Sequence, residues 1–129
     1  MRALLTHPYV LVFVGGGAGS LLRYVVGRLI PATLISRPFP IAILSVNILA
    51  SFVLGAVVGW ALNRSVGEEA RLLIGVGFCG GLSTFSSFSY DTIVLLQNGR
   101  MASALLNIVL NVVFCLLASV GGLWLGQKL

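Results

Sequence analysis

The residues best suited to chemistry gather in one short run of hydroxyl and phenyl side chains, Ser83-Thr84-Phe85-Ser86-Ser87-Phe88-Ser89. Phe85 and Phe88 are three residues apart, so they share one face of a helix. A phenyl ring has a positive edge, and ring edges together with hydroxyl donors can hold a small anion. Such binding is weak, as conduction requires. The run therefore predicts a site through which a small anion passes.

A break in the helix is expected just before these phenylalanines. Gly80 and Gly81 are followed by the hydroxyl-rich run, and this composition is poor for a continuous helix from Gly80 to Thr84. Backbone groups freed at membrane depth must find partners in protein, water or an ion. Free carbonyls are hard oxygen donors that suit Na⁺.

Two further rows of small or polar residues recur at four-residue spacing, which places each row along one helix face. The rows are Ser103, Asn107, Asn111, Cys115 and Ser119, and Asn47, Ser51, Gly55 and Gly59. We interpret Ser51, Ser119 and the glycines as helix-packing positions. The amides of Asn47, Asn107 and Asn111 are functional candidates, because polar side chains inside a membrane face protein or a water-filled path.

Arg23 is a permanent positive charge about two-thirds of the way along the first apolar segment. It either extends to the membrane surface or lines an aqueous vestibule that attracts anions. We favour the vestibule, because Gly19 and Gly27 flank Arg23 at four-residue spacing and let it approach a neighbouring helix.

The elements that must position these residues are membrane-spanning helices. The 129 residues are 58% hydrophobic and 9% charged, whereas soluble domains carry about 25% charge. Apolar runs predict an all-α membrane protein with a single domain over 1–129 and four spans, about 9–30, 41–62, 72–96 and 102–126. The third span is expected to be broken in mid-membrane. Short connections leave no room for an extramembrane domain, and His7 is the only histidine, so an enzyme is not expected.

The basic residues give no clear orientation. Four would lie on each side of the membrane, Arg2, Arg64, Arg71 and Lys128 against Arg23, Arg28, Arg37 and Arg100. Insertion in both orientations and a weakly biased single orientation both remain open. These residues are scattered and form no stripe that could follow a phosphate backbone, so nucleic acid is not an expected partner. Cys79 and Cys115 lack the companions of a metal or disulfide pattern and are expected to pack.

Nearly the whole chain resembles the Fluc/CrcB family of fluoride channels. The likeness rests on the glycine-rich first span with Gly19-Ser-Leu-Leu-Arg-Tyr24, on Val46-Asn47, on the run GFCGGLSTFSSFS at 77–89 and on the polar-faced fourth span. The run at 77–89 is the most specific of these motifs.

The resemblance implies an antiparallel, dual-topology homodimer in the cell (inner) membrane, with two fluoride pathways built from both subunits. Passive fluoride efflux would protect the cell. The pathway residues would be Phe85 and Phe88 as a phenylalanine box, Asn47, Thr84, Ser86, Ser87, Arg23, Asn107 and Asn111. Backbone carbonyls of Gly80 and Ser83 would hold a structural Na⁺ at the dimer interface.

The chain departs from the family pattern at several positions. Ala42-Ile43 stands where many members have Gly-Thr, and Asp91 replaces a common glutamate. Asn107 and Asn111 replace tyrosine and serine in the fourth span. These changes keep polar side chains in the row along the fourth span but alter how far those side chains extend.

Two other functions fit four short spans. A small dual-topology, proton-coupled multidrug exporter would need a titratable carboxylate in the bundle, and Asp91, near a span end, is the only acid inside a span. A non-conducting subunit of a paralogous heterodimer would use its rows of small residues only for packing.

Overall fold

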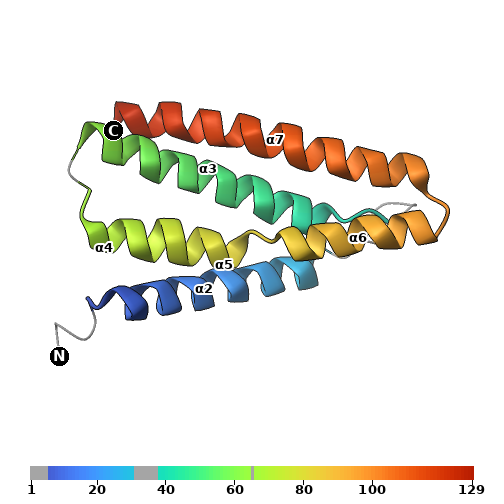
Figure 1. Ribbon diagram of the computed structural model, residues 1–129, viewed down its shortest axis with the longest axis horizontal. Helices are drawn as coiled ribbons and strands as arrows, with labels where there is room; N and C mark the ends of the chain where they lie inside the picture. The colour runs from blue at the N-terminus through green and yellow to red at the C-terminus, as the bar shows by residue number, and fades with distance from the viewer. Residues whose placement is uncertain (1–5, 31–37, 65) are drawn as a thin grey trace.

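A computed structural model describes residues 6–30, 38–64 and 66–129, and every regular element in these ranges is helical. Successive long helical segments run in opposite directions along one long axis (Figure 1). The first and last described residues therefore lie at the same end of the molecule. The elements are α2 (Pro8–Leu29), α3 (Ile41–Asn63), α4 (Glu68–Ala70), η2 (Arg71–Cys79), α5 (Gly80–Leu82), α6 (Phe85–Gln97) and α7 (Met101–Lys128).

Local sequence explains the start of the first helix and the connection between the last two. Pro8 opens α2, where the missing amide proton and fixed φ of proline fit the first turn. Gly99 adopts a φ of +70° between α6 and α7, a conformation that glycine tolerates without a steric cost. The chain therefore turns at Asn98 and Gly99 to join the two helices.

The third long apolar segment consists of four helical pieces. The π-helical η2 continues from α4 into α5, and the helix then stops at Ser83 and Thr84, whose backbones are extended. In Figure 1, α4 and α5 lie in one half of the molecule and α6 in the other. The interruption is shorter than the stretch from Gly80 to Thr84 that we expected, because Gly80, Gly81 and Leu82 remain helical.

Glycines bring the backbones of α3 and α7 into close contact. A Cβ at Gly55 or Gly59 would lie 2.3 Å or 2.2 Å from a carbonyl oxygen of α7, and a Cβ at Gly122 or Gly126 would lie 2.1 Å from one of α3. Ser119 Oγ donates to the Ser51 carbonyl at 3.5 Å. The packing interpretation of Ser51, Ser119 and the glycine row is confirmed.

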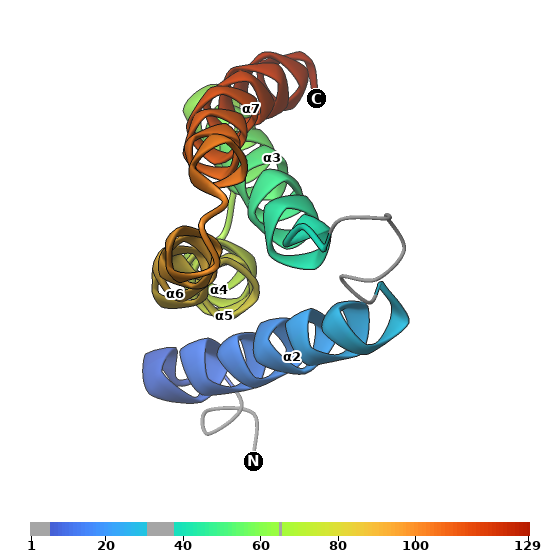
Figure 2. The ribbon, with the colours of Figure 1, turned by 90° about the vertical axis from the view of Figure 1, so that its right-hand side faces the viewer.

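The helix α2 crosses the third segment in the same manner. A Cβ at Gly15 would lie 2.1 Å from the Leu73 carbonyl oxygen, and one at Gly81 would lie 2.2 Å from that of Gly16. Seen along the long axis, α2 lies across the end of the row formed by α7, α3 and the third segment (Figure 2). The small residues of the first span thus hold α2 against η2 and α5.

Most of the apolar surface faces outward. Six hydrophobic residues of the described chain are buried, namely Val46, Ala50, Cys79, Leu82, Leu95 and Ala104. Four candidate spans, Pro8–Leu29, Ile41–Asn63, Glu68–Gln97 and Met101–Lys128, are long and apolar enough to cross a membrane. Since lipid tails are as apolar as leucine, a bundle in a bilayer has no need to bury this surface. These bounds agree closely with the four predicted spans.

Candidate functional site

The interruption between α5 and α6 is stabilised first by Thr84, the N-cap residue of α6. Its Oγ1 accepts from the Ser87 amide at 3.2 Å, which satisfies one of the free amides at the start of the helix. The same oxygen lies 3.2 Å from both Ser86 Oγ and Ser87 Oγ. Three of the predicted hydroxyls therefore form one cluster at the first turn of α6.

Asn47 of α3 holds the backbone of Thr84. The Thr84 amide donates to Asn47 Oδ1 at 2.8 Å, and Asn47 Nδ2 donates to the Thr84 carbonyl at 3.4 Å. This side chain gives the extended residue the partners that a helix would have supplied. The amide of Asn47 thus anchors the interruption to α3.

Asn107 and Asn111 connect this anchor to α6. Asn47 Nδ2 donates to Asn111 Oδ1 at 3.1 Å, Asn111 Nδ2 donates to Asn107 Oδ1 at 3.0 Å, and Asn107 Nδ2 donates to Thr92 Oγ1 at 2.9 Å. Asn107 and Asn111 are 1% and 6% exposed. All fully buried side-chain nitrogen and oxygen atoms of the described residues have a partner. The three amides singled out from the sequence therefore form one satisfied network.

The two phenylalanines stand at the start of α6, next to the hydroxyl cluster. Their ring centroids are 5.4 Å apart and the ring planes are inclined by 51°. Phe88 is half-buried, whereas Phe85 is 80% exposed. A single chain consequently presents the rings on its surface and does not enclose them.

Arg23 reaches from α2 to the interruption. Its Nη1 donates to the Ser83 carbonyl at 3.3 Å, and Ser20 Oγ, nearly one turn earlier, donates to the Gly81 carbonyl at 3.4 Å. Gly19 is in close backbone contact with Phe78 and Leu82, as expected for a helix that approaches a neighbour here, but a Cβ at Gly27 would meet no atom of the described residues within 4 Å. Of the two glycines that we expected beside a neighbouring helix, Gly19 is packed against one, whereas Gly27 is not.

The carbonyls expected to hold a cation belong to Gly80, the first residue of α5, and to Ser83, the residue that follows α5. In a continuous helix the Thr84 amide would donate to the Gly80 carbonyl, but it donates to Asn47 instead. The Gly80 carbonyl has thereby lost its helical donor, and Gly80 is exposed. The Ser83 carbonyl accepts from Arg23 and keeps a second lone pair.

Sequence reasoning missed Thr92 and Ser20. Thr92 is 7% exposed, accepts from Asn107, and donates from Oγ1 to the Phe88 carbonyl at 2.8 Å. A threonine in a helix often donates to the carbonyl four residues earlier. Because Thr92 follows Phe88 by four residues, its bond to the Phe88 carbonyl could have been predicted from the sequence. Nothing local marks Ser20 as a partner of Gly81, which lies 61 residues further along the chain.

The sequence is similar to proteins of one known family. Residues 10–123 match the family described as CrcB-like protein, Camphor Resistance (CrcB). The chain is 50% identical over 105 residues to the fluoride-specific ion channel FluC of Pyrococcus furiosus, covering 79% of this chain and 81% of that protein. It is 43% identical over 108 residues to the FluC of Methanocaldococcus jannaschii, covering 84% and 85% of the two chains.

The likeness extends to bacterial proteins. The FluC of Klebsiella pneumoniae is 42% identical over 117 residues, which cover 88% of this chain and 89% of that one. These relatives are named as ion channels, a function that involves no catalysis. The likeness suggested by the motifs is confirmed, and with its four apolar helices the chain is a multi-pass membrane protein of the CrcB-like family.

Proposed function

We propose that this protein is a fluoride-selective channel that lets fluoride leave the cell passively across the cell (inner) membrane. The observation that carries the proposal is the phenyl pair at the start of α6, next to three clustered hydroxyls and a helix interruption held by Asn47. The relatives named as fluoride-specific channels support the choice of ion.

The electrostatics of the site favour a small anion. The first amides of α6 carry partial positive charge, and the edges of Phe85 and Phe88 and the hydroxyls of Ser86 and Ser87 add weak donors. Arg23 supplies a full positive charge within reach of the interruption, where it attracts anions without enclosing them. Attraction at the vestibule combined with weak contacts along the path permits both entry and exit.

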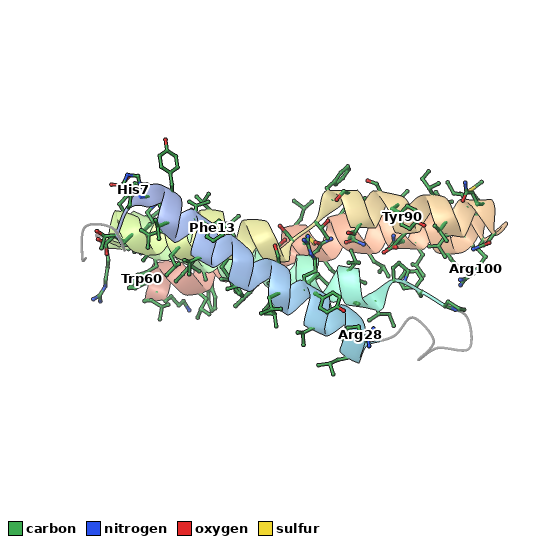
Figure 3. The ribbon with its side chains drawn as sticks, turned by 90° about the horizontal axis from the view of Figure 1, so that it is seen from below. His7, Phe13, Arg28, Trp60, Tyr90 and Arg100 are labelled. Carbon is green, nitrogen blue, oxygen red and sulfur yellow. The ribbon has the colours of Figure 1, made fainter. Side chains whose placement is uncertain are left out.

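We propose that two antiparallel copies complete two such pathways. The 80% exposure of Phe85 supports this, because one chain leaves its ring open to a neighbour. The charges also support dual topology. On one side, Arg64 follows the end of α3, Arg71 begins η2 and Lys128 ends α7. Arg28 and Arg100 lie toward the other side, opposite His7 and Trp60 (Figure 3). Arg2 and Arg37, expected on opposite sides, lie outside the described residues.

The donor chemistry fits a structural Na⁺ between the two copies. Gly80 and Ser83 would hold it through backbone carbonyls, two from each chain. The diverted Thr84 amide leaves the Gly80 carbonyl available, and carbonyl oxygens are hard donors that suit an alkali cation. When bound, the cation would join the two interruptions and neutralise their carbonyl dipoles.

Flux from liposomes tests the function. Purified protein in liposomes loaded with both potassium fluoride and potassium chloride should release fluoride to an ion-selective electrode once valinomycin allows K⁺ to follow. Electrogenic release with chloride retained supports the channel. Cation movement coupled to protons would instead indicate the exporter, and no movement at all would indicate a non-conducting subunit.

A matched pair of substitutions tests the site. Phe88→Ile removes the ring edge but keeps an apolar side chain, so we expect fluoride release to fall about tenfold or more while the protein stays assembled. Phe13→Ile is the control, because Phe13 is 81% exposed on α2 and precedes Arg23 by ten residues, or about 15 Å along the helix. Full flux in Phe88→Ile would remove this ring from the pathway.

A further inference from the structure

The hydrogen bonds around Asn47 form a closed loop that begins and ends on α6. From the Thr84 amide at the N-cap the chain of bonds runs through Asn47 on α3 and then Asn111 and Asn107 on α7. It returns to α6 at Thr92, whose hydroxyl donates to the Phe88 carbonyl. The two ends of the loop therefore enclose the first turn of α6, which carries both phenyl rings.

The direction of every bond in this loop is fixed by its ends. The Thr84 amide can only donate, and the Phe88 carbonyl can only accept. Each side-chain amide between them must then present Oδ1 toward Thr84 and Nδ2 toward Thr92. Thr92 is the one hydroxyl in the loop, and it both accepts and donates.

We propose that Thr92 is a positioning residue of the ion pathway, which holds the first turn of α6 directly and the placement of Asn47 through Asn107 and Asn111. This inference rests on the proposed channel function. Without the Thr92 hydroxyl, Asn107 Nδ2 loses its acceptor. The side chain of Asn107 is only 1% exposed, so leaving this donor unpaired is costly. If Asn107 shifts toward another acceptor, it disturbs the bond that its Oδ1 accepts from Asn111, and Asn111 passes the displacement to Asn47.

The same bonds show that Asn111 acts through its neighbours. Its Nδ2 donates to both the carbonyl and the Oδ1 of Asn107, each at 3.0 Å, so both of its amide hydrogens are used. Its Oδ1 accepts from Asn47. Asn111 thus has no free donor for an anion in this arrangement and serves to orient Asn47.

Three variants of the full-length protein test the proposal. Thr92→Val keeps the shape of the side chain and removes both of its bonds, while Thr92→Ser restores the hydroxyl. Ser45→Ala is the control, because Ser45 Oγ makes the same bond to the carbonyl four residues earlier, at 2.8 Å, but belongs to no loop. We expect fluoride flux per assembled protein to fall about tenfold in Thr92→Val and to return in Thr92→Ser.

A second measurement separates positioning from simple stability. The side-chain amide resonances of Asn47 in ¹⁵N-labelled protein in detergent micelles should shift in Thr92→Val, return in Thr92→Ser and stay unchanged in Ser45→Ala. A purely structural loss would lower the melting temperature but leave these resonances of the folded protein in place.

Asn107→Leu extends the test along the loop. If Thr92 acts through Asn107, adding Thr92→Val to Asn107→Leu lowers the flux by no more than about twofold further, because the shared bond is already lost. Full additivity of the two losses would contradict this route.

The outcomes separate the two proposals. Folded Thr92→Val with wild-type flux and unchanged Asn47 resonances overturns the positioning role. If wild-type protein releases no fluoride, the channel function fails, and the role of Thr92 in orienting Asn47 is then decided by the resonances alone.

Discussion

Replacing Gly122 by alanine should separate α3 from α7. A Cβ at this position would lie 2.1 Å from the Phe52 carbonyl oxygen and 2.9 Å from the Ala56 amide nitrogen. Both atoms belong to the backbone of α3, so no side-chain rotation can relieve the clash. The neighbouring Gly121 is the matched control, because a Cβ there meets nothing within 4 Å.

The magnitude follows from the displacement required. Ordinary contact begins near 3.4 Å, so the helices must move apart locally by about 1 Å, and overpacking of this kind costs roughly 1–3 kcal/mol. Alanine is favoured over glycine in a helix by about 1 kcal/mol, and this gain is the same for both variants. The difference in free energy of unfolding between Gly122→Ala and Gly121→Ala therefore isolates the steric cost, at about 1–3 kcal/mol.

Unfolding in mixed detergent micelles measures this difference. Trp60 on α3 and Trp124 on α7 are the two tryptophans and lie in the halves of the two helices that these glycines join, so their emission reports separation of the pair. We expect the unfolding midpoint of Gly122→Ala to fall below that of Gly121→Ala. Equal midpoints for the two variants would refute the close backbone packing of α3 on α7.

Three other predictions concern the interruption and the assembly. Thr84→Val removes the N-cap oxygen of α6 and should cost about 1 kcal/mol of stability in the same unfolding assay. Thr84→Ser should restore most of this stability. Equal stability of the wild type and both variants would argue against the cap. Replacing Na⁺ by N-methyl-D-glucamine should lower the melting temperature of the purified protein if the Gly80 and Ser83 carbonyls hold the cation, whereas an unchanged melting temperature would count against the cation site. A tandem fusion of two copies forced into antiparallel orientation should conduct fluoride, and conduction by the parallel fusion alone would contradict dual topology.

The four spans and the asparagines that need partners inside them could be predicted from the sequence. A bilayer requires about 20 apolar residues per helix, so apolar runs and polar boundaries located the four spans to within a few residues. The same rule made Asn47, Asn107 and Asn111 stand out, because amides inside a membrane need partners.

The extent of the interruption could not be predicted in this way. Two glycines suggested that the helix would already end at Gly80, yet Gly80 to Leu82 stay helical. The residue that loses its helical bond is Thr84, because Asn47, 37 residues away in sequence, offers its amide an acceptor. A contact of this kind depends on how α3 packs, and no local pattern contains that information.

The sequence by itself determined that this is a membrane protein, where its helices lie and which polar side chains inside the spans need partners. Each of these follows from composition and spacing along one chain. Only the tertiary structure decided what the polar groups bond to: that Arg23 reaches Ser83, that the asparagines orient one another, and that Thr92 closes their loop. The physical reason is that a hydrogen bond has a direction and a short range. Its partners are therefore fixed only when helix packing brings donor and acceptor atoms within about 3 Å of each other.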